Sequence, residues 1–122
     1  MQKKVLVADD TADIRDVLKS LIECRGHGVI VAENGLIAYE QAWKHLPDLI
    51  LMDIAMPIMD GIEATLKLRS DPKTAALRIV CITSYDRRGE LMALDAGCDE
   101  AFSKSTFSSD FDRILKNYLS AL

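Results

Sequence analysis

The stretch Leu49-Ile50-Leu51-Met52-Asp53 most constrains what this chain can fold into. Four apolar residues run directly into one carboxylate, and Pro57 follows shortly after. A continuous apolar run bounded in this way is typical of a strand that is buried on both faces of a sheet. Asp53 then lies at the carboxyl end of that strand, which is the edge where open α/β sheets bind their ligands. We therefore expect the rest of the chain to place partner groups around Asp53.

Apolar runs of this kind alternate along the chain with segments of helical periodicity. We predict strands at residues 5–8, 29–32, 49–53, 77–83 and 101–103. The first predicted helix has the apolar face Ile14, Val17, Leu18, Leu21 and Ile22, and the second is capped by Asn34 and runs to about residue 44. The third contains Ile62, Leu66 and Arg69 and should end before Asp71-Pro72. The fourth spans about 87–96, and the last has an apolar stripe from Phe107 to Leu119. Alternating strands and helices predict a parallel sheet covered on both faces.

This pattern describes one α/β domain over residues 1–122, built from five βα units. The common strand order for five such units is 2-1-3-4-5, which gives a flavodoxin-like, doubly wound, three-layer sandwich. The order is taken from that general rule and is not worked out from the residues.

The composition excludes several classes of protein. The net charge is −4, whereas general nucleic-acid binding requires a surface with an excess of basic residues. No apolar run approaches the ~20 residues of a membrane-spanning helix, and the first residues are not a signal peptide. Cys24, Cys81 and Cys98 have no metal-type spacing, so reduced thiols are expected. These features predict a cytoplasmic protein without direct membrane or nucleic-acid contacts.

Polar side chains end or follow four of the predicted strands: Asp9 and Asp10, Asp53, Thr83, and Lys104. In the expected order the first and third strands are neighbours, so the three carboxylates face one another. Two unit charges ~4 Å apart repel by ~4 kcal/mol at an effective dielectric of about 20. A hard dication such as Mg²⁺, which prefers oxygen ligands, removes this repulsion. A carboxylate nucleophile, a metal and a lysine together are the equipment for phosphoryl transfer onto an aspartate.

These residues resemble the receiver domain of two-component response regulators, over nearly the whole chain. The matching residues are Asp9-Asp10, Asp53, Met56-Pro57-Ile58-Met59-Asp60-Gly61, Thr83 and Lys104. The resemblance implies that Asp53 accepts a phosphoryl group from a histidine kinase or a histidine phosphotransfer protein, and that water later removes it. It implies a regulatory domain, not an enzyme, which catalyses only its own phosphorylation and dephosphorylation.

The resemblance also implies roles for the surrounding groups. Asp9, Asp10, Asp53 and the backbone carbonyl of Ala55 would bind Mg²⁺. Thr83 and Lys104 would contact the phosphoryl oxygens. A downstream protein would bind the face formed by helix 87–96, strand 101–103 and the last helix, with Arg87-Arg88 as a basic contact or simply a solvated helix start. The kinase would meet the first helix, whose exposed face is expected to include Arg15 and Lys19.

Ser105 departs from the family pattern, which usually has a proline joined by a cis bond after the lysine. A cis bond before a non-proline residue costs ~2.5–4 kcal/mol, against about 0.5–1 kcal/mol before proline. We therefore predict a trans Lys104–Ser105 bond, with a different aim of Lys104 or a shifted entry to the last helix. The alternative is a cis bond that stores strain at the site.

Ala101 is the second departure, because family members often have Tyr or Phe there. That ring turns inward when the threonine hydroxyl moves to the phosphate. Phe102 is one residue on, and alternate residues of a strand face opposite ways, so we expect it to point into the core. The usual aromatic switch is then absent. We expect the two signalling states to differ in the backbone after Thr83 and in helix 87–96.

Two further positions bear on the lifetime of the phosphorylated state. The resemblance implies that residues 55 and 85 tune this lifetime. Ala55 has no side-chain group to position a water and Tyr85 could shield the phosphoryl group, so we predict slower phosphate loss than in members with polar groups there.

Two other functions compete with the leading one. The first is a receiver-fold interaction module that signals without phosphate. Ser105 and Ala101 favour this alternative, whereas the presence of all three acidic residues argues against it. The second is a phosphatase with an aspartate nucleophile, which is disfavoured because Asp53 lacks the paired Asp-x-Asp of such enzymes.

Overall fold

The computed structural model describes residues 2–84 and 87–120. Its strands are β1 (Lys4–Ala8), β2 (Gly28–Ala32), β3 (Leu49–Asp53), β4 (Ile79–Thr83) and β5 (Glu100–Ser103). Its helices are α1 (Ala12–Glu23), α2 (Gly35–His45), α3 (Gly61–Ser70), α4 (Arg87–Ala96) and α5 (Lys104–Leu119). The strands are parallel and lie in the order β2-β1-β3-β4-β5, which confirms the predicted fold class and strand order.

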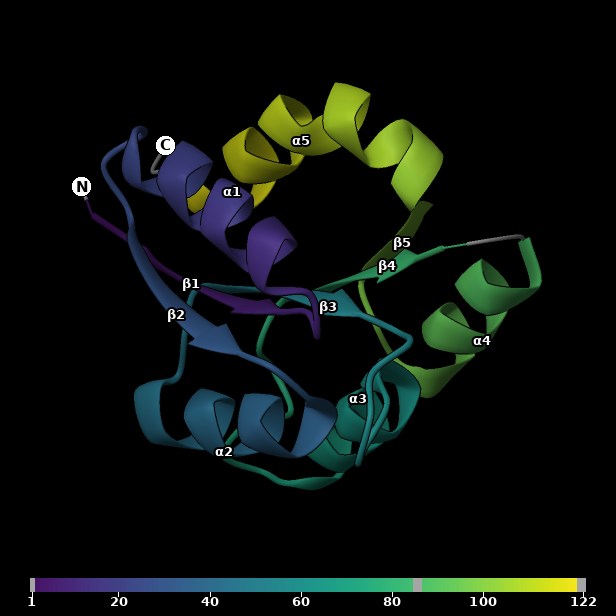
Figure 1. Ribbon diagram of the computed structural model, residues 1–122. Helices are drawn as coiled ribbons and strands as arrows, with labels where there is room; N and C mark the ends of the chain where they lie inside the picture. Colours follow the sequence, from purple (N-terminus) through teal and green to yellow (C-terminus); the bar gives the residue numbers. More distant parts are fainter. Residues whose placement is uncertain (1, 85–86, 121–122) are drawn as a thin grey trace.

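The sheet crosses the middle of the molecule, with α1 and α5 on one face and α2, α3 and α4 on the other (Figure 1). Each face of the sheet has its own hydrophobic core. Leu6, Ile50 and Met52 pack toward α2, α3 and α4, whereas Leu49 and Leu51 pack toward α1 and α5. All five β3 residues are buried, as the apolar run predicts.

The C-terminal strand follows the predicted alternation. Ala101 packs against the core beneath α2, α3 and α4, and Phe102 packs against the core beneath α1 and α5. Phe102 therefore points into the core, as expected. Strand β4 begins at Ile79, two residues later than predicted. The backbone carbonyl of Leu77, before the strand, accepts a hydrogen bond of 2.5 Å from the guanidinium of Arg69.

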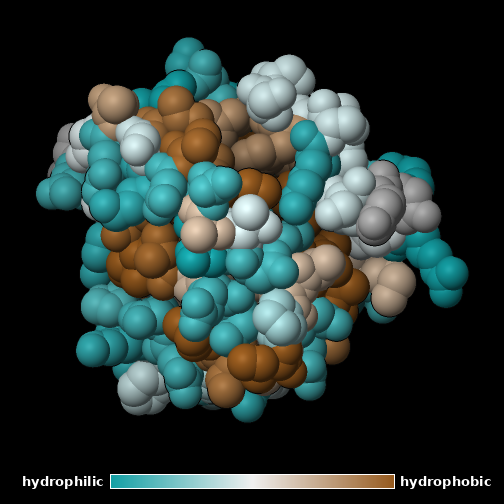
Figure 2. Space-filling view, viewed as in Figure 1, coloured by the Kyte–Doolittle hydropathy of each residue, from teal (hydrophilic) through white to brown (hydrophobic). Residues whose placement is uncertain are grey.

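The predicted apolar face of α1 is too broad. Only Ile22 is buried, whereas the side chains of Val17 and Leu21 are 58% and 41% exposed. The residues that face the protein are Ile14, Leu18 and Ile22, at a spacing of four, because this part of the helix contacts the sheet along one narrow stripe. Hydrophobic side chains are accordingly visible on the surface over α1 (Figure 2).

Other local predictions concern the helix caps, the thiols and the membrane. Asn34 caps α2, since its Oδ1 accepts a hydrogen bond of 2.8 Å from the backbone N–H of Ile37. Cys24, Cys81 and Cys98 are free thiols. Among the described residues, none of the helices combines the length and the apolar character needed to cross a membrane.

Candidate functional site

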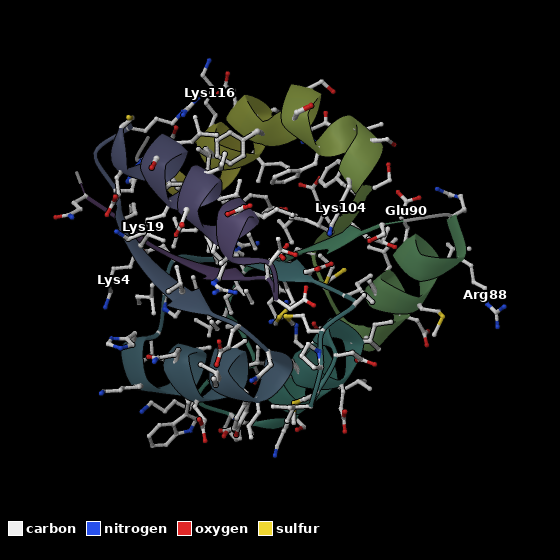
Figure 3. The ribbon with its side chains drawn as sticks, in the orientation of Figure 1. Lys4, Lys19, Arg88, Glu90, Lys104 and Lys116 are labelled. Carbon is white, nitrogen blue, oxygen red and sulfur yellow. The ribbon has the colours of Figure 1, made fainter. Side chains whose placement is uncertain are left out.

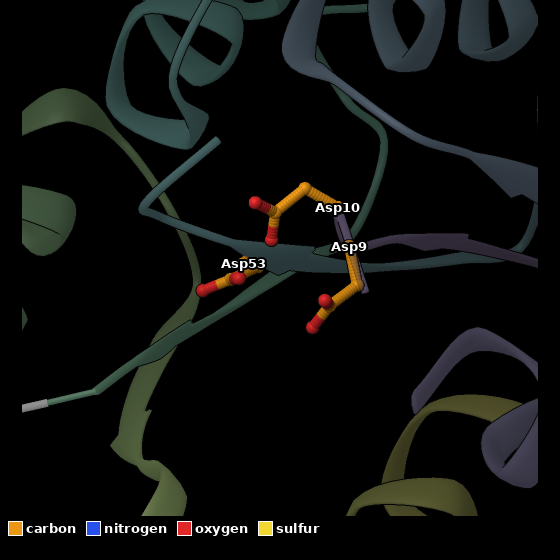
Figure 4. Close-up of side chains that lie close together, drawn as sticks. All are labelled: Asp9, Asp10 and Asp53. Carbon is orange, nitrogen blue, oxygen red and sulfur yellow. The ribbon is translucent and has the colours of Figure 1, made fainter. Parts of the chain in front are cut away.

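Three carboxylates meet at the carboxyl edge of the sheet. Asp9 directly follows β1 and Asp53 ends β3, and these two strands are paired side by side. One oxygen from each of Asp9, Asp10 and Asp53 lies within 4.8 Å of the others (Figure 4). The strand order therefore brings the predicted acidic residues together, as the sequence pattern indicates.

The three carboxylates differ in burial and in partners. Asp10 is exposed, whereas Asp9 and Asp53 are only 4% and 2% exposed. Asp9 Oδ1 accepts a hydrogen bond of 2.8 Å from the backbone N–H of Thr11. Asp53 Oδ1 is buried without a hydrogen-bond partner within the described part of the chain. A buried carboxylate oxygen is costly to leave unsatisfied, so this atom fits the place of a cation ligand.

Burial and charge strongly perturb Asp53. Loss of solvation, followed by repulsion from Asp9, raises the pKa of Asp53 from its ordinary value of 3.8 to about 6. Lys104 and the backbone N–H of Ala55 oppose this rise, and Asp10 adds to it. A set of three hard oxygen ligands that repel one another suits Mg²⁺ or Ca²⁺, which bind through carboxylates and water. The residues present therefore fit a divalent cation.

Lys104 supplies the positive charge at the other side of Asp53. Its Nζ lies 3.5 Å from Asp53 Oδ2, and its side chain is 36% exposed. In Figure 3 Lys104 points toward the middle of the molecule, whereas Arg88 points away from the body of the protein. The Lys104–Ser105 bond is trans, as predicted, and α5 begins at Lys104 itself. The lysine reaches Asp53 without the usual proline.

Thr83 and Ala55 lie beside this charged cluster. Thr83 is the last residue of β4 and is 5% exposed, and it follows Ile82, the residue that pairs with Asp53. Thr83 and the exposed Ala55 both line a hollow of about 360 Å³ that extends to α4. Tyr85, the predicted shield of the phosphoryl group, lies outside the described residues.

Arg15 is a residue whose place the sequence analysis misjudged. We expected it on the exposed face of α1, but it is half-buried, and its guanidinium donates a hydrogen bond of 2.7 Å to the backbone carbonyl of Asp9. The bond ties α1 to the end of β1 beside the acidic cluster. Helical spacing alone gives no signal for such a contact. Lys19 is exposed, as expected, and pairs with Glu23.

The loop after β3 contains two further residues that position the site. Asp60 caps α3, because its Oδ1 accepts a hydrogen bond of 2.8 Å from the backbone N–H of Glu63. The next residue, Gly61, packs so tightly that a Cβ atom there would lie 2.2 Å from the backbone oxygen of Asp53. The pair Asp60-Gly61 predicts only a turn. The acidic residue three positions after Asp60 is the available signal for a helix cap.

Comparison with known proteins identifies the family. The family model of the response regulator receiver domain matches residues 5–116. The chain belongs to the response regulator receiver family. This receiver is 32% identical over 120 residues to the polar-differentiation response regulator DivK of Brucella anthropi, covering 98% of both chains.

Solved structures of receivers have the same fold as this one. The response regulator domain of Thermotoga maritima CheB is 32% identical, with a TM-score of 0.81 over 97% of this chain and 94% of the other. A structure described as a response regulator from Chloroflexus aurantiacus is 25% identical, with a TM-score of 0.89 over 99% of this chain and 100% of the other. The receiver is therefore a regulatory domain of the two-component type.

Proposed function

We propose that residues 1–122 form a single receiver domain in which Asp53 accepts a phosphoryl group from a phosphohistidine donor, in a reaction that depends on Mg²⁺. The observation that carries the proposal is the environment of Asp53. This carboxylate is 2% exposed and lies next to two acidic residues and Lys104, and one of its oxygens has no hydrogen-bond partner among residues 2–84 and 87–120. A buried carboxylate with a purely structural role would have hydrogen-bond partners for both oxygens. The environment of Asp53 therefore supports a role in binding ligands.

The chain's own residues account for the chemistry of the transfer. Asp53, with a pKa of about 6, is mostly ionised at neutral pH and can attack the phosphorus atom of the donor. An Asp53 O–P bond forms while the P–N bond to the donor's histidine breaks, and the imidazole leaves. Lys104, 3.5 Å away, is placed to balance the negative charge that the phosphoryl oxygens bring. The Thr83 hydroxyl would donate a hydrogen bond to one of those oxygens.

The metal would be held by Asp9, Asp10, Asp53 and the backbone carbonyl of Ala55. When bound, Mg²⁺ supplies positive charge to the carboxylates and to the phosphoryl oxygens. Water later removes the phosphoryl group from Asp53. Ala55 has no side-chain polar group to position that water, and we propose that the phosphorylated state of this receiver is comparatively long-lived.

The donor would be a histidine kinase or a histidine phosphotransfer protein, since receivers act with such proteins. For the downstream protein, we propose the face of α4, β5 and α5. Leu91 and Leu94 on α4 are 51% and 43% exposed, and Arg88 extends from the start of the same helix (Figure 3). The exposed leucines offer apolar contacts, and Arg88 offers a charge. We propose that the protein works in the cytoplasm, where such kinases deliver their phosphate.

The experiment is phosphorylation by a small donor. The protein is incubated with acetyl phosphate and Mg²⁺, and its intact mass is measured beside an Asp53→Ala variant. A gain of one phosphoryl group that requires Asp53 and is lost with EDTA supports the proposal. No gain, together with no Mg²⁺ binding, overturns it. That result favours the alternative hypothesis of a phosphate-independent interaction module, which is the one that Ser105 and Ala101 support.

A further inference from the structure

The first turn of α4 lies against the side chain of Thr83. Gly89 is the third residue of α4, and a Cβ atom there would lie 2.6 Å from Thr83 Oγ1 and 3.3 Å from Thr83 Cβ. Both separations are shorter than ordinary van der Waals contact between a methyl group and its neighbours. The Thr83 hydroxyl can hold its present orientation only because residue 89 has no side chain.

Glycine at this position carries a cost that calls for a compensating role. Within a helix, glycine is less favourable than alanine by about 1 kcal/mol, because it loses more backbone entropy on folding. Gly89 has no positive φ, so its backbone conformation is open to other residues. The three atoms nearest to the Cβ of an alanine there would all belong to the side chain of Thr83. The tight fit to this one residue is therefore what glycine provides.

The orientation of the Thr83 hydroxyl matters because it has two competing positions. Threonine is branched at Cβ, so its side chain occupies few discrete rotamers. In the present structure the hydroxyl faces α4 at Gly89. A hydroxyl that donates to a phosphoryl group on Asp53 would turn toward the neighbouring strand β3. In the rotamer that then places the small β-hydrogen of Thr83 beside Gly89, the space held by the hydroxyl oxygen is vacated.

We propose that Gly89 is a positioning residue of the switch: it provides the space in which the Thr83 hydroxyl rests beside α4 before Asp53 is phosphorylated. Rotation of the hydroxyl toward the phosphoryl group empties this space and releases the contact that holds the first turn of α4. The inference rests on the proposed function of Asp53. It supplies a route from the site to the helix that would meet a partner.

Two features of this chain require such a direct route. Ala101 has a methyl group with no rotamers, and it is packed against the core, so it cannot follow Thr83 as a larger ring would. The hollow of about 360 Å³ beside the site is lined by Thr83, Gly89 and Met92, and Met92 is 49% exposed on α4. The first turn of α4 therefore borders open space next to its contact with Thr83.

The variant Gly89→Ala tests the proposal through the affinity for beryllofluoride, a phosphoryl mimic, measured in the presence of Mg²⁺. The added methyl group makes the α4-facing rotamer of Thr83 unfavourable. If the phosphoryl-facing rotamer is populated to about 10% in the wild type, the variant binds beryllofluoride up to about tenfold more tightly. Thermal unfolding of each variant establishes that it is folded.

The background at residue 83 separates this effect from a general change in the helix. In Thr83→Ser the hydroxyl remains, and Gly89→Ala should still raise the affinity. In Thr83→Ala the clashing oxygen is gone, and the effect should disappear. An unchanged or weaker affinity of folded Gly89→Ala would overturn the proposal. So would an equal gain in the Thr83→Ala background, because the methyl group would then act through helix stability alone.

A measurement on the unaltered protein keeps the proposal testable if Gly89→Ala does not fold. Three-bond couplings of the Thr83 methyl group report its χ1 rotamer in solution. The proposal predicts one rotamer in the free protein and another after beryllofluoride is added; the same rotamer in both states contradicts it. A wild-type protein that neither binds beryllofluoride nor gains phosphate overturns the proposed function as well, whereas one that does both with no effect at Gly89 overturns only this inference.

Discussion

Replacing Asp53 by asparagine should stabilise the receiver in the absence of Mg²⁺. The Oδ1 atom of the buried Asp53 carboxylate has no hydrogen-bond partner in the part of the chain that the structure describes. Folding removes this carboxylate from water and places it beside Asp9, which raises its pKa from 3.8 to about 6. At about 1.36 kcal/mol for each pKa unit, this difference corresponds to about 3 kcal/mol of folding free energy lost when Asp53 is ionised. Asparagine has a similar size and no charge, so it avoids that loss.

The pH dependence gives the prediction its sign. Well below pH 3.8, Asp53 is neutral in both the folded and the unfolded protein and carries no penalty. As the pH rises from about 4 to about 6, the unfolded chain loses this proton first, and the wild type loses stability relative to Asp53→Asn. Above that range the advantage of the variant is constant, at up to about 3 kcal/mol.

The assay is urea unfolding of both proteins in EDTA at intervals from pH 4.5 to pH 8. The control is Asp95→Asn, which removes one exposed carboxylate from α4 and changes the net charge equally. Addition of Mg²⁺ at pH 8 should reduce the difference, because only the wild type has the full set of ligands. A variant no more stable than the wild type at pH 8, or an advantage that does not shrink toward pH 4.5, would refute the reasoning.

Three other substitutions test separate parts of the account. Lys104→Ala should slow phosphorylation by acetyl phosphate by about a hundredfold, because it removes the cation beside the phosphoryl oxygens; Lys116→Ala, elsewhere on α5, should leave the rate unchanged. Gly61→Ala should cost about 2 kcal/mol of unfolding free energy, since its Cβ atom would lie 2.2 Å from the backbone oxygen at the end of β3. Gly28→Ala, whose nearest neighbour is a flexible side chain at 3.4 Å, serves as its control and should cost far less. Asn34→Ala should lower the unfolding free energy by about 1 kcal/mol through loss of the α2 cap, which chemical denaturation can measure; no loss would mean that the cap contributes nothing.

The strands and the acidic cluster are predictable because their signals are local. The run that ends at Asp53 has the composition of a buried strand, and the rule for strand order then brings Asp9 to its side. Asn34 is a recognisable cap because capping depends on a residue and the N–H groups just after it. Even the trans bond before Ser105 follows from the nature of the residue itself.

What the sequence does not predict depends on how elements pack. Apolar spacing places Val17 on the inner face of α1, but the width of the buried stripe depends on the sheet beneath it. Arg15 reaches the carbonyl of Asp9 because of the position of α1 over the end of β1. Gly89 in the sequence is only a weak helix residue, and its approach to Thr83 appears only once α4 is placed.

The most direct test of the central claim is to locate the phosphoryl group on the chain. The protein is treated with acetyl phosphate with and without Mg²⁺ and then with borohydride, which reduces an aspartyl phosphate to homoserine. Peptide sequencing by mass spectrometry then reads the residue at each position. The account predicts homoserine at position 53 only in the presence of Mg²⁺. Homoserine at another aspartate, or the same yield without Mg²⁺, would contradict it.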